Sequence, residues 1–78
     1  MNKDVLLNLI KDALEAEEIG LNSSMDNTDG WDSLGHLSIL SAIDQSLDGK
    51  ASNLDELASA TSVEKIISIL EKNNLLNL

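Results

Sequence analysis

Hydrophobic residues recur at spacings of three and four along the first part of the chain, which predicts an amphipathic helix from about Lys3 to Glu17. Asn2 precedes this pattern and is the candidate N-cap, Asp4 would lie in the first turn, and Gly20 is the candidate stop signal. The positions that carry the pattern are Val5, Leu6, Leu9, Ile10, Ala13 and Leu14.

The segment from Ile19 to Trp31 shows no sustained period and is rich in Asn, Ser, Asp and Gly, so we predict a long loop. A loop of this length in a small domain is usually functional or held by its own side chains. If Gly30 were the turn glycine of a calcium-binding loop, Met25 and His36 would occupy the first and last ligand positions, so no metal site is predicted. The side chains expected to hold the loop against the core are Ile19, Leu21, Met25 and Trp31.

A second amphipathic helix is predicted from Ser33 to Leu47, with Asp32 as its N-cap. At roughly 100° per residue, one side of this helix is polar except for Leu34, which is therefore predicted to be exposed. The residues expected to face the core are Leu37, Ile39, Leu40, Ile43 and Leu47, and those on the polar side are Ser38, Ser41 and Gln45.

The remainder of the chain predicts one short and one longer helix. A turn at residues 48–50 ends the second helix, and Ser52 is expected to cap a short helical segment over residues 53–58. Residues 61–64, Thr-Ser-Val-Glu, read as a capping box for the last helix, and residues 73–78 form a leucine-containing tail whose placement the pattern leaves open. The expected apolar contacts are Leu54, Leu57 and Ala58 in the short segment and Val63, Ile66, Ile67 and Leu70 in the last helix.

These elements place the chain in the all-α class, as a small four-helix bundle with three main helices, one short helix and a long loop between helices 1 and 2. No linker or second periodic region is present, so residues 1–78 are expected to form one domain, which we expect to be monomeric. With Trp31 as the sole aromatic residue the core must be aliphatic, and 78 residues leave too little interior for an enzyme cleft of ordinary size.

The formal net charge is −9, from fourteen acidic residues against five lysines. Such a surface repels nucleic acid and anionic membranes and favours basic patches on protein partners. The absence of cysteine excludes a disulfide framework, a thiolate metal site and a cysteine nucleophile. The N-terminal residues do not resemble a signal peptide and no stretch is long enough to span a bilayer, so a cytoplasmic protein is expected.

The most informative stretch runs from Asp29 to Leu34, where the polar loop gives way to the second helical pattern. Capping by Asp32 would place Ser33 at the start of that helix. The first turn of a helix has backbone N–H groups without intrahelical partners and a partial positive charge, so a phosphate attached to this serine would be favoured electrostatically.

The triplet Asp32-Ser33-Leu34, opening the second amphipathic helix of a small acidic chain, resembles the acyl carrier protein family, and the resemblance covers essentially the whole chain. It implies that Ser33 carries a 4′-phosphopantetheine arm, which a phosphopantetheinyl transferase moves there from coenzyme A. It further implies that the thiol of the arm holds an acyl or aminoacyl cargo as a thioester. The implied partners are an acyl-loading ligase or acyltransferase and downstream synthase enzymes. On this interpretation the chain is not an enzyme, and it supplies recognition and a high effective concentration of tethered cargo.

The same comparison suggests which residues surround the arm and contact partners. Carriers of bacterial fatty acid synthesis typically have acidic residues along the second helix, where this chain has Gly35, Ser38 and Gln45. Rim charges mainly set partner choice, so we expect a specialised carrier for one dedicated ligase or pathway, and Gly35 resembles peptidyl carrier domains. The residues expected to contact partners are Asp32, Leu34, Ser38, Asp44, Gln45 and Asp48, and those expected near the arm are Trp31, His36 and Leu37.

Two functions of other classes are consistent with the residues. An acidic helical adapter would bind a basic protein surface unmodified, with Asp32 and Ser33 serving only as a cap. A small hydrolase would need His36, three residues after Ser33, as its base, but the chain has no Gly-x-Ser-x-Gly elbow. We expect His36 to be packed or half-buried, near enough to a phosphate on Ser33 for its protonated form to be favourable there.

Overall fold

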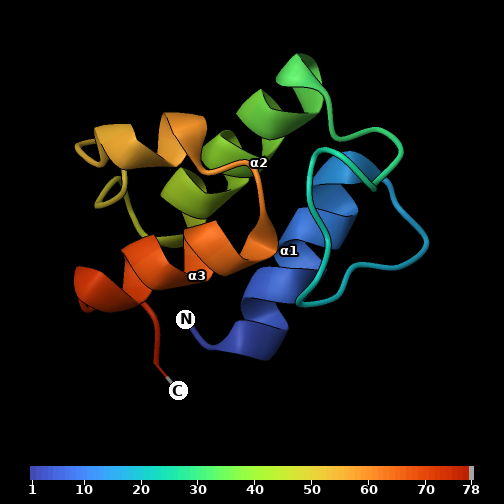
Figure 1. Ribbon diagram of the computed structural model, residues 1–78. Coiled ribbons are helices and arrows are strands. Elements are labelled where there is room, and N and C mark those ends of the chain that lie inside the picture. Colours follow the sequence, from blue (N-terminus) through green and yellow to red (C-terminus); the bar gives the residue numbers. More distant parts are fainter. Residues whose placement is uncertain (78) are drawn as a thin grey trace.

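The computed structural model describes residues 1–77 and contains three α-helices and one 3₁₀-helix. Their order along the chain is α1 (Lys3–Leu14), α2 (Ser33–Ser46), η1 (Asp55–Ser59) and α3 (Val63–Lys72) (Figure 1). No strand is present in these residues, which confirms the all-α class as a small helical fold. One aliphatic core joins the elements, and its most deeply buried large side chains are Leu6, Ile10, Ile39, Ile43, Val63, Ile66 and Leu70.

Side-chain N-caps begin all three α-helices. Asn2 and Asp32 cap α1 and α2 as predicted, each accepting a hydrogen bond of 2.8 Å from the backbone N–H three residues on. In α3 the cap is Ser62, which accepts from the Lys65 N–H at 3.2 Å. The capping box predicted for residues 61–64 is therefore out of register by one residue.

Backbone pairing explains this shift in register. The carbonyl of Thr61 accepts from the Met25 N–H at 2.9 Å, and the Val63 N–H donates to the Ser23 carbonyl at 3.0 Å. These two bonds tie the long loop to the start of α3 and leave the next hydroxyl, that of Ser62, to cap the helix.

The loop before α2 is held partly as predicted. Trp31 is buried, and Ile19 and Met25 are partly buried against the core. Leu21, in contrast, is 49% exposed, so its predicted anchoring role is wrong. Asn27 takes part of that role, because its Oδ1 accepts from the Ser24 N–H at 2.9 Å and closes a turn within the loop.

The three α-helices share one kind of C-terminal end, in which a residue other than glycine has left-handed backbone. These residues are Glu15, Asp48 and Asn74, with φ of 54°, 54° and 59°. In each case the N–H of the following residue donates to the carbonyl five residues earlier, at 2.8 to 3.0 Å. This is the Schellman ending, which usually has glycine at the left-handed position.

The Schellman ending corrects the predicted end of α1. The helix stops at Leu14 rather than at Glu17, and Gly20 lies in the loop beyond it. The chain turns at Glu15, directly after the buried Leu14, and the acidic residues that follow lie on the surface. A glutamate gives no sequence signal for a left-handed position, so the helix predicted from the periodicity extended beyond the observed end of α1.

Replacing Glu15 with glycine should stabilise the fold. Left-handed backbone costs a residue with a Cβ about 1 kcal/mol, and the change also removes a negative charge from the negative end of the helix dipole. We expect Glu15→Gly to raise the free energy of unfolding by about 0.5–1 kcal/mol in urea denaturation. Glu17→Gly is the control, since Glu17 is exposed without a positive φ. Equal loss of stability in both variants would contradict the assignment.

The buried side of α2 matches the prediction except at Leu37 and its neighbour His36. Ile39 and Ile43 are buried as predicted, but Leu37 is 61% exposed while its neighbour His36 is only 6% exposed. Adjacent helical residues are roughly 100° apart, so burial of His36 at the centre of the stripe turns Leu37 to its edge. The other residues predicted to face the core, Leu40 and Leu47, are partly buried.

The short segment is a 3₁₀-helix over Asp55–Ser59 rather than the helix predicted over residues 53–58. Ser52 does not cap it, because its hydroxyl donates to the Gly49 carbonyl at 2.7 Å. Leu57 is buried as predicted, whereas Ala58 is exposed.

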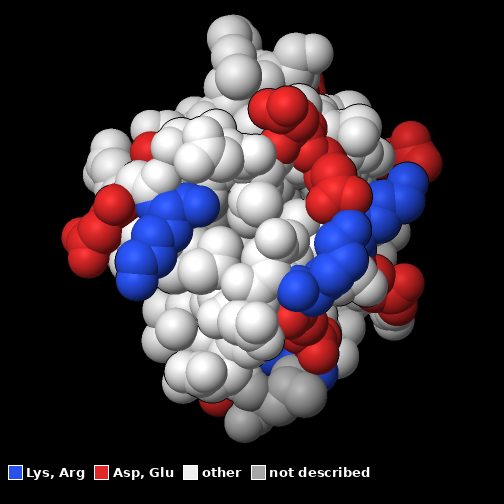
Figure 2. Space-filling view, turned by 90° about the vertical axis from the view of Figure 1, so that its left-hand side faces the viewer, with Lys and Arg blue, Asp and Glu red and all other residues white. Residues whose placement is uncertain are grey.

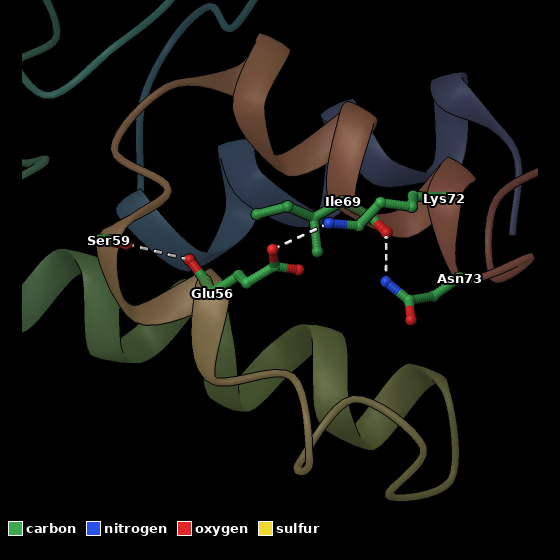
Figure 3. Close-up of polar contacts among 5 residues, drawn as sticks. All are labelled: Glu56, Ser59, Ile69, Lys72 and Asn73. Atoms are coloured by element: carbon green, nitrogen blue, oxygen red, sulfur yellow. Dashed lines mark hydrogen bonds and ion pairs between the residues drawn. The ribbon is translucent and has the colours of Figure 1, made fainter.

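A surface ion pair connects η1 with α3. Lys72 Nζ lies 2.8 Å from Glu56 Oε1, and both side chains are more than half exposed (Figure 3). In the same region Asn73 Nδ2 donates to the Ile69 carbonyl at 2.8 Å. Exposed pairs of this kind contribute about 0–1 kcal/mol, so burial of Leu57 is the larger contribution to holding η1 in place.

The tail after α3 returns to the start of the chain, as Figure 1 shows. Leu76 is buried in the core, and the Asn77 N–H donates to the Met1 carbonyl at 2.6 Å. Leu78 lies outside the described residues. None of the helices formed by residues 1–77 combines the length and the apolar character needed to cross a membrane.

Candidate functional site

Ser33 is the first residue of α2, and its side chain is exposed. Asp32 stabilises the helix start through its side chain and its backbone. Its Oδ1 accepts a hydrogen bond from the Gly35 N–H, and its backbone carbonyl accepts one from the His36 N–H, each at 2.8 Å. Within residues 1–77 the Ser33 hydroxyl makes no hydrogen bond, so it is free for chemistry with an incoming group. The sequence placed this serine correctly because an N-cap is a local signal.

The first turn of α2 lies directly against the backbone of the preceding loop. A Cβ added at Gly35 would be 2.2 Å from the Gly30 carbonyl oxygen and 2.8 Å from Leu14 Cδ2 of α1. Gly30 itself has φ of 86°, a backbone conformation that favours glycine. Two glycines thus allow the loop and the helix start to approach closely. The sequence offered one sign of this, a weak helix former one turn into a helix.

The residues on either side of the exposed helix start are buried and hydrogen-bonded to each other. Trp31 Nε1 donates to His36 Nδ1 at 3.1 Å, and His36 Nε2 lies 2.9 Å from the Leu57 carbonyl of η1. The indole N–H is only a donor, so Nδ1 must accept and Nε2 must carry the proton that is donated to Leu57. This chain of bonds fixes the backbone before and after Ser33 against η1.

The same bonds change the roles predicted for His36. Because Nδ1 accepts from Trp31 and Nε2 donates to Leu57, neither nitrogen is free to take a proton from Ser33, and the Ser33–His36 dyad is not formed. Trp31 and His36 instead position the helix start.

Trp31→Phe should lower stability by about 1–2 kcal/mol, because it keeps an aromatic ring but leaves the buried His36 Nδ1 without its donor. Urea denaturation followed by far-UV circular dichroism measures this loss. In the double variant Trp31→Phe/His36→Leu, the effect of the tryptophan change should shrink, because no unpaired nitrogen remains. Purely additive effects of the two changes would contradict the hydrogen-bond assignment.

Most of the residues predicted to contact partners are accessible. Asp44 is the exception: it is half-buried, and its Oδ1 is enclosed without a hydrogen-bond partner in the described part of the chain. Its expected role in contacting partners stays a prediction. The exposed members of the set are Asp32, Leu34, Ser38, Gln45 and Asp48, and Leu34 is 76% exposed.

Charge is distributed unevenly along the chain and hence over the surface. From Asp12 to Gly49, a stretch that contains the end of α1, the long loop and all of α2, there are nine acidic residues and no lysine. The face that carries η1 and the C-terminal end of α3 has lysine side chains next to acidic ones (Figure 2). The stretch that contains Ser33 therefore carries a net negative charge, which favours approach by a basic surface.

The acidic residues do not assemble into a metal site. Among residues 1–77 no group of three or more His, Asp or Glu side chains is placed to hold a metal ion. A hollow in the first loop is lined by the acidic residues Glu15, Glu17, Glu18 and Asp29 together with uncharged residues of the loop.

No protein-family model matches the chain, and comparison with curated proteins and with solved structures finds no match. The site consists of an exposed serine at a capped helix start, between the buried residues Trp31 and His36.

Proposed function

We propose that the chain is a carrier protein of the acyl carrier type, with Ser33 as the attachment point of 4′-phosphopantetheine. The observation that supports this most directly is the exposed Ser33 hydroxyl at the first residue of α2, without a hydrogen-bond partner among residues 1–77. A transferase needs such a hydroxyl, presented on a fixed backbone and not covered by other side chains.

The helix start fits a phosphodiester electrostatically. Backbone N–H groups of the first turn point toward it, and the Asp32 side chain occupies the N–H of Gly35 rather than those of Ser33 and Leu34. When attached, the arm supplies the thiol that the cysteine-free chain lacks, and this thiol would hold the cargo as a thioester. The residues of the chain hold the attachment point and recognise partners.

The proposal includes the partners. They are a phosphopantetheinyl transferase, a ligase or acyltransferase that loads the cargo, and synthase enzymes that use it, in a cytoplasmic setting. Ser38 and Gln45 give α2 an exposed face that is polar but uncharged at these positions, which supports a carrier dedicated to one pathway. We also propose that the fold is a four-helix bundle of the carrier type, in which η1 is the short fourth element.

The test is a modification assay on the purified chain. We would incubate it with coenzyme A, magnesium and a phosphopantetheinyl transferase of broad specificity, and record the intact mass. One phosphopantetheine addition is expected. An unchanged mass for the folded protein, in a reaction that modifies a known carrier protein, would refute the proposal.

An acidic adapter that binds a basic partner without modification is the second candidate. The run of nine acidic residues without a lysine from Asp12 to Gly49 favours it, because this feature needs no arm to be useful. If the protein isolated from its native host is unmodified and Ser33→Ala leaves its function intact, the adapter is the better account.

A further inference from the structure

Exposed hydrophobic side chains gather at one place on the surface. Among residues 1–77, four large hydrophobic residues are substantially exposed, and three of them, Val5, Leu34 and Leu37, line the seam between α1 and α2. The fourth, Leu21, lies in the long loop. Isolated exposed leucines are ordinary, but clustering along one seam is typical of an interaction site.

The seam is hollowed along its length. One hollow is bordered by Leu34, Leu37 and the polar side of α2, and a second by Val5 and neighbouring residues of α1. Both are lined by Ala13 of α1 and Ala42 of α2, so they adjoin and form one groove with small side chains between its two walls. We call this the α1–α2 groove, and its lining residues are Val5, Asn8, Leu9, Asp12, Ala13, Leu34, Leu37, Ser38, Ser41, Ala42 and Gln45.

The charge around the groove indicates what it binds. Asp12 is the charged residue that lines it, and α2 carries no lysine. Lys11, the neighbour of Asp12 on α1, lines a separate hollow together with Glu17 and Glu18. A second copy of this chain would bring the same acidic stretch and a net charge of −9, so pairing of two copies is disfavoured. A partner that combines apolar side chains with Lys or Arg matches both the apolar lining and the acidic surroundings.

We propose that the α1–α2 groove binds an amphipathic helix of a partner protein, with aliphatic side chains packed along it against Leu37 and Val5 and basic side chains at the rim. An amphipathic helix laid in an apolar groove between two helices is a recurrent mode of recognition. The proposal goes beyond carrier chemistry: it requires the α1 wall as well as α2, and it holds for the unmodified chain.

The test uses a synthetic helical peptide of leucine and lysine, with leucine at helical spacing, titrated into the isotope-labelled unmodified protein and followed by backbone amide NMR. We expect saturable shifts along both walls of the groove. Leu37→Ser and Val5→Ser should each weaken binding about tenfold, the effect of losing one buried aliphatic side chain. Leu21→Ser is the matched control, because Leu21 is also exposed but lies outside the groove, and its affinity should equal that of the wild type.

Several results would overturn the proposal. Binding of a leucine–glutamate peptide with equal affinity would show that charge plays no part, and equal weakening by Leu21→Ser would show that the groove is not the site. If the amide shifts were confined to α2 and Val5→Ser bound the peptide as tightly as the wild type, α1 would not take part in binding. A dimer in sedimentation velocity would make a second copy the occupant. Ser33→Ala should bind the peptide normally, so failure here is distinguishable from failure of the modification assay.

Discussion

Ser33→Ala should abolish addition of phosphopantetheine while leaving the protein folded. The Ser33 hydroxyl forms no hydrogen bond within residues 1–77, so removing it costs little stability, whereas it is the only atom through which the arm would be attached. Intact mass measured after incubation with transferase, coenzyme A and magnesium should show one addition for the wild type and none for the variant.

Two other serines on α2 provide matched controls. Ser38 and Ser41 are exposed on the same helix. Ser38→Ala and Ser41→Ala therefore make the same change at another exposed position and leave Ser33 in place. Both should be modified to completion. Modification that persists in Ser33→Ala, or that disappears in a control variant with native circular dichroism, would contradict the assignment of the site.

Gly35→Ala should destabilise the fold by about 3 kcal/mol, at the upper end of the cost of overpacking. The added methyl would lie 2.2 Å from the Gly30 carbonyl oxygen, and a backbone atom cannot move aside as the end of a flexible side chain can. The first turn of α2 would have to shift away from the loop. Urea denaturation gives the loss, and amide NMR should place the largest shifts at residues 30–36.

Gly20→Ala is the control for this prediction, because a Cβ at Gly20 meets no atom within 4 Å and the residue has no positive φ. It should be neutral or slightly stabilising, as expected when glycine is replaced in a compatible conformation. A Gly35→Ala variant as stable as Gly20→Ala would mean that the loop and α2 are farther apart than described. In the folded fraction of Gly35→Ala we also expect slower modification of Ser33, since the clash displaces the attachment point.

The sequence alone determined the features that depend on neighbours within a few residues. Asn2 and Asp32 were identified as caps because an N-cap hydrogen bond joins a side chain to the backbone N–H only three residues later in the sequence. The periods of the apolar residues gave the three α-helices and their order, and with them the all-α class. The position of Ser33 at the start of α2 follows from the same local signals.

Predictions went wrong where a distant partner overrode a local pattern. The prediction that Leu37 faces the core is wrong, whereas His36, which we expected to be packed, is buried because Trp31 and Leu57 satisfy both of its ring nitrogens. Likewise Glu15 has the side chain of a helix former, but it takes a left-handed conformation at the end of α1, which no local signal in the sequence predicts.

For the candidate site, the sequence supplied the chemical group and the tertiary structure supplied its surroundings. Ser33, Asp32 and Leu34 are consecutive, so their arrangement at a helix start is a local property. The α1–α2 groove depends instead on how two helices cross. The support beneath the helix start also depends on tertiary contacts, because the Gly30 carbonyl, Leu14 and Leu57 reach it from other elements, and spacing along the chain does not report such distances.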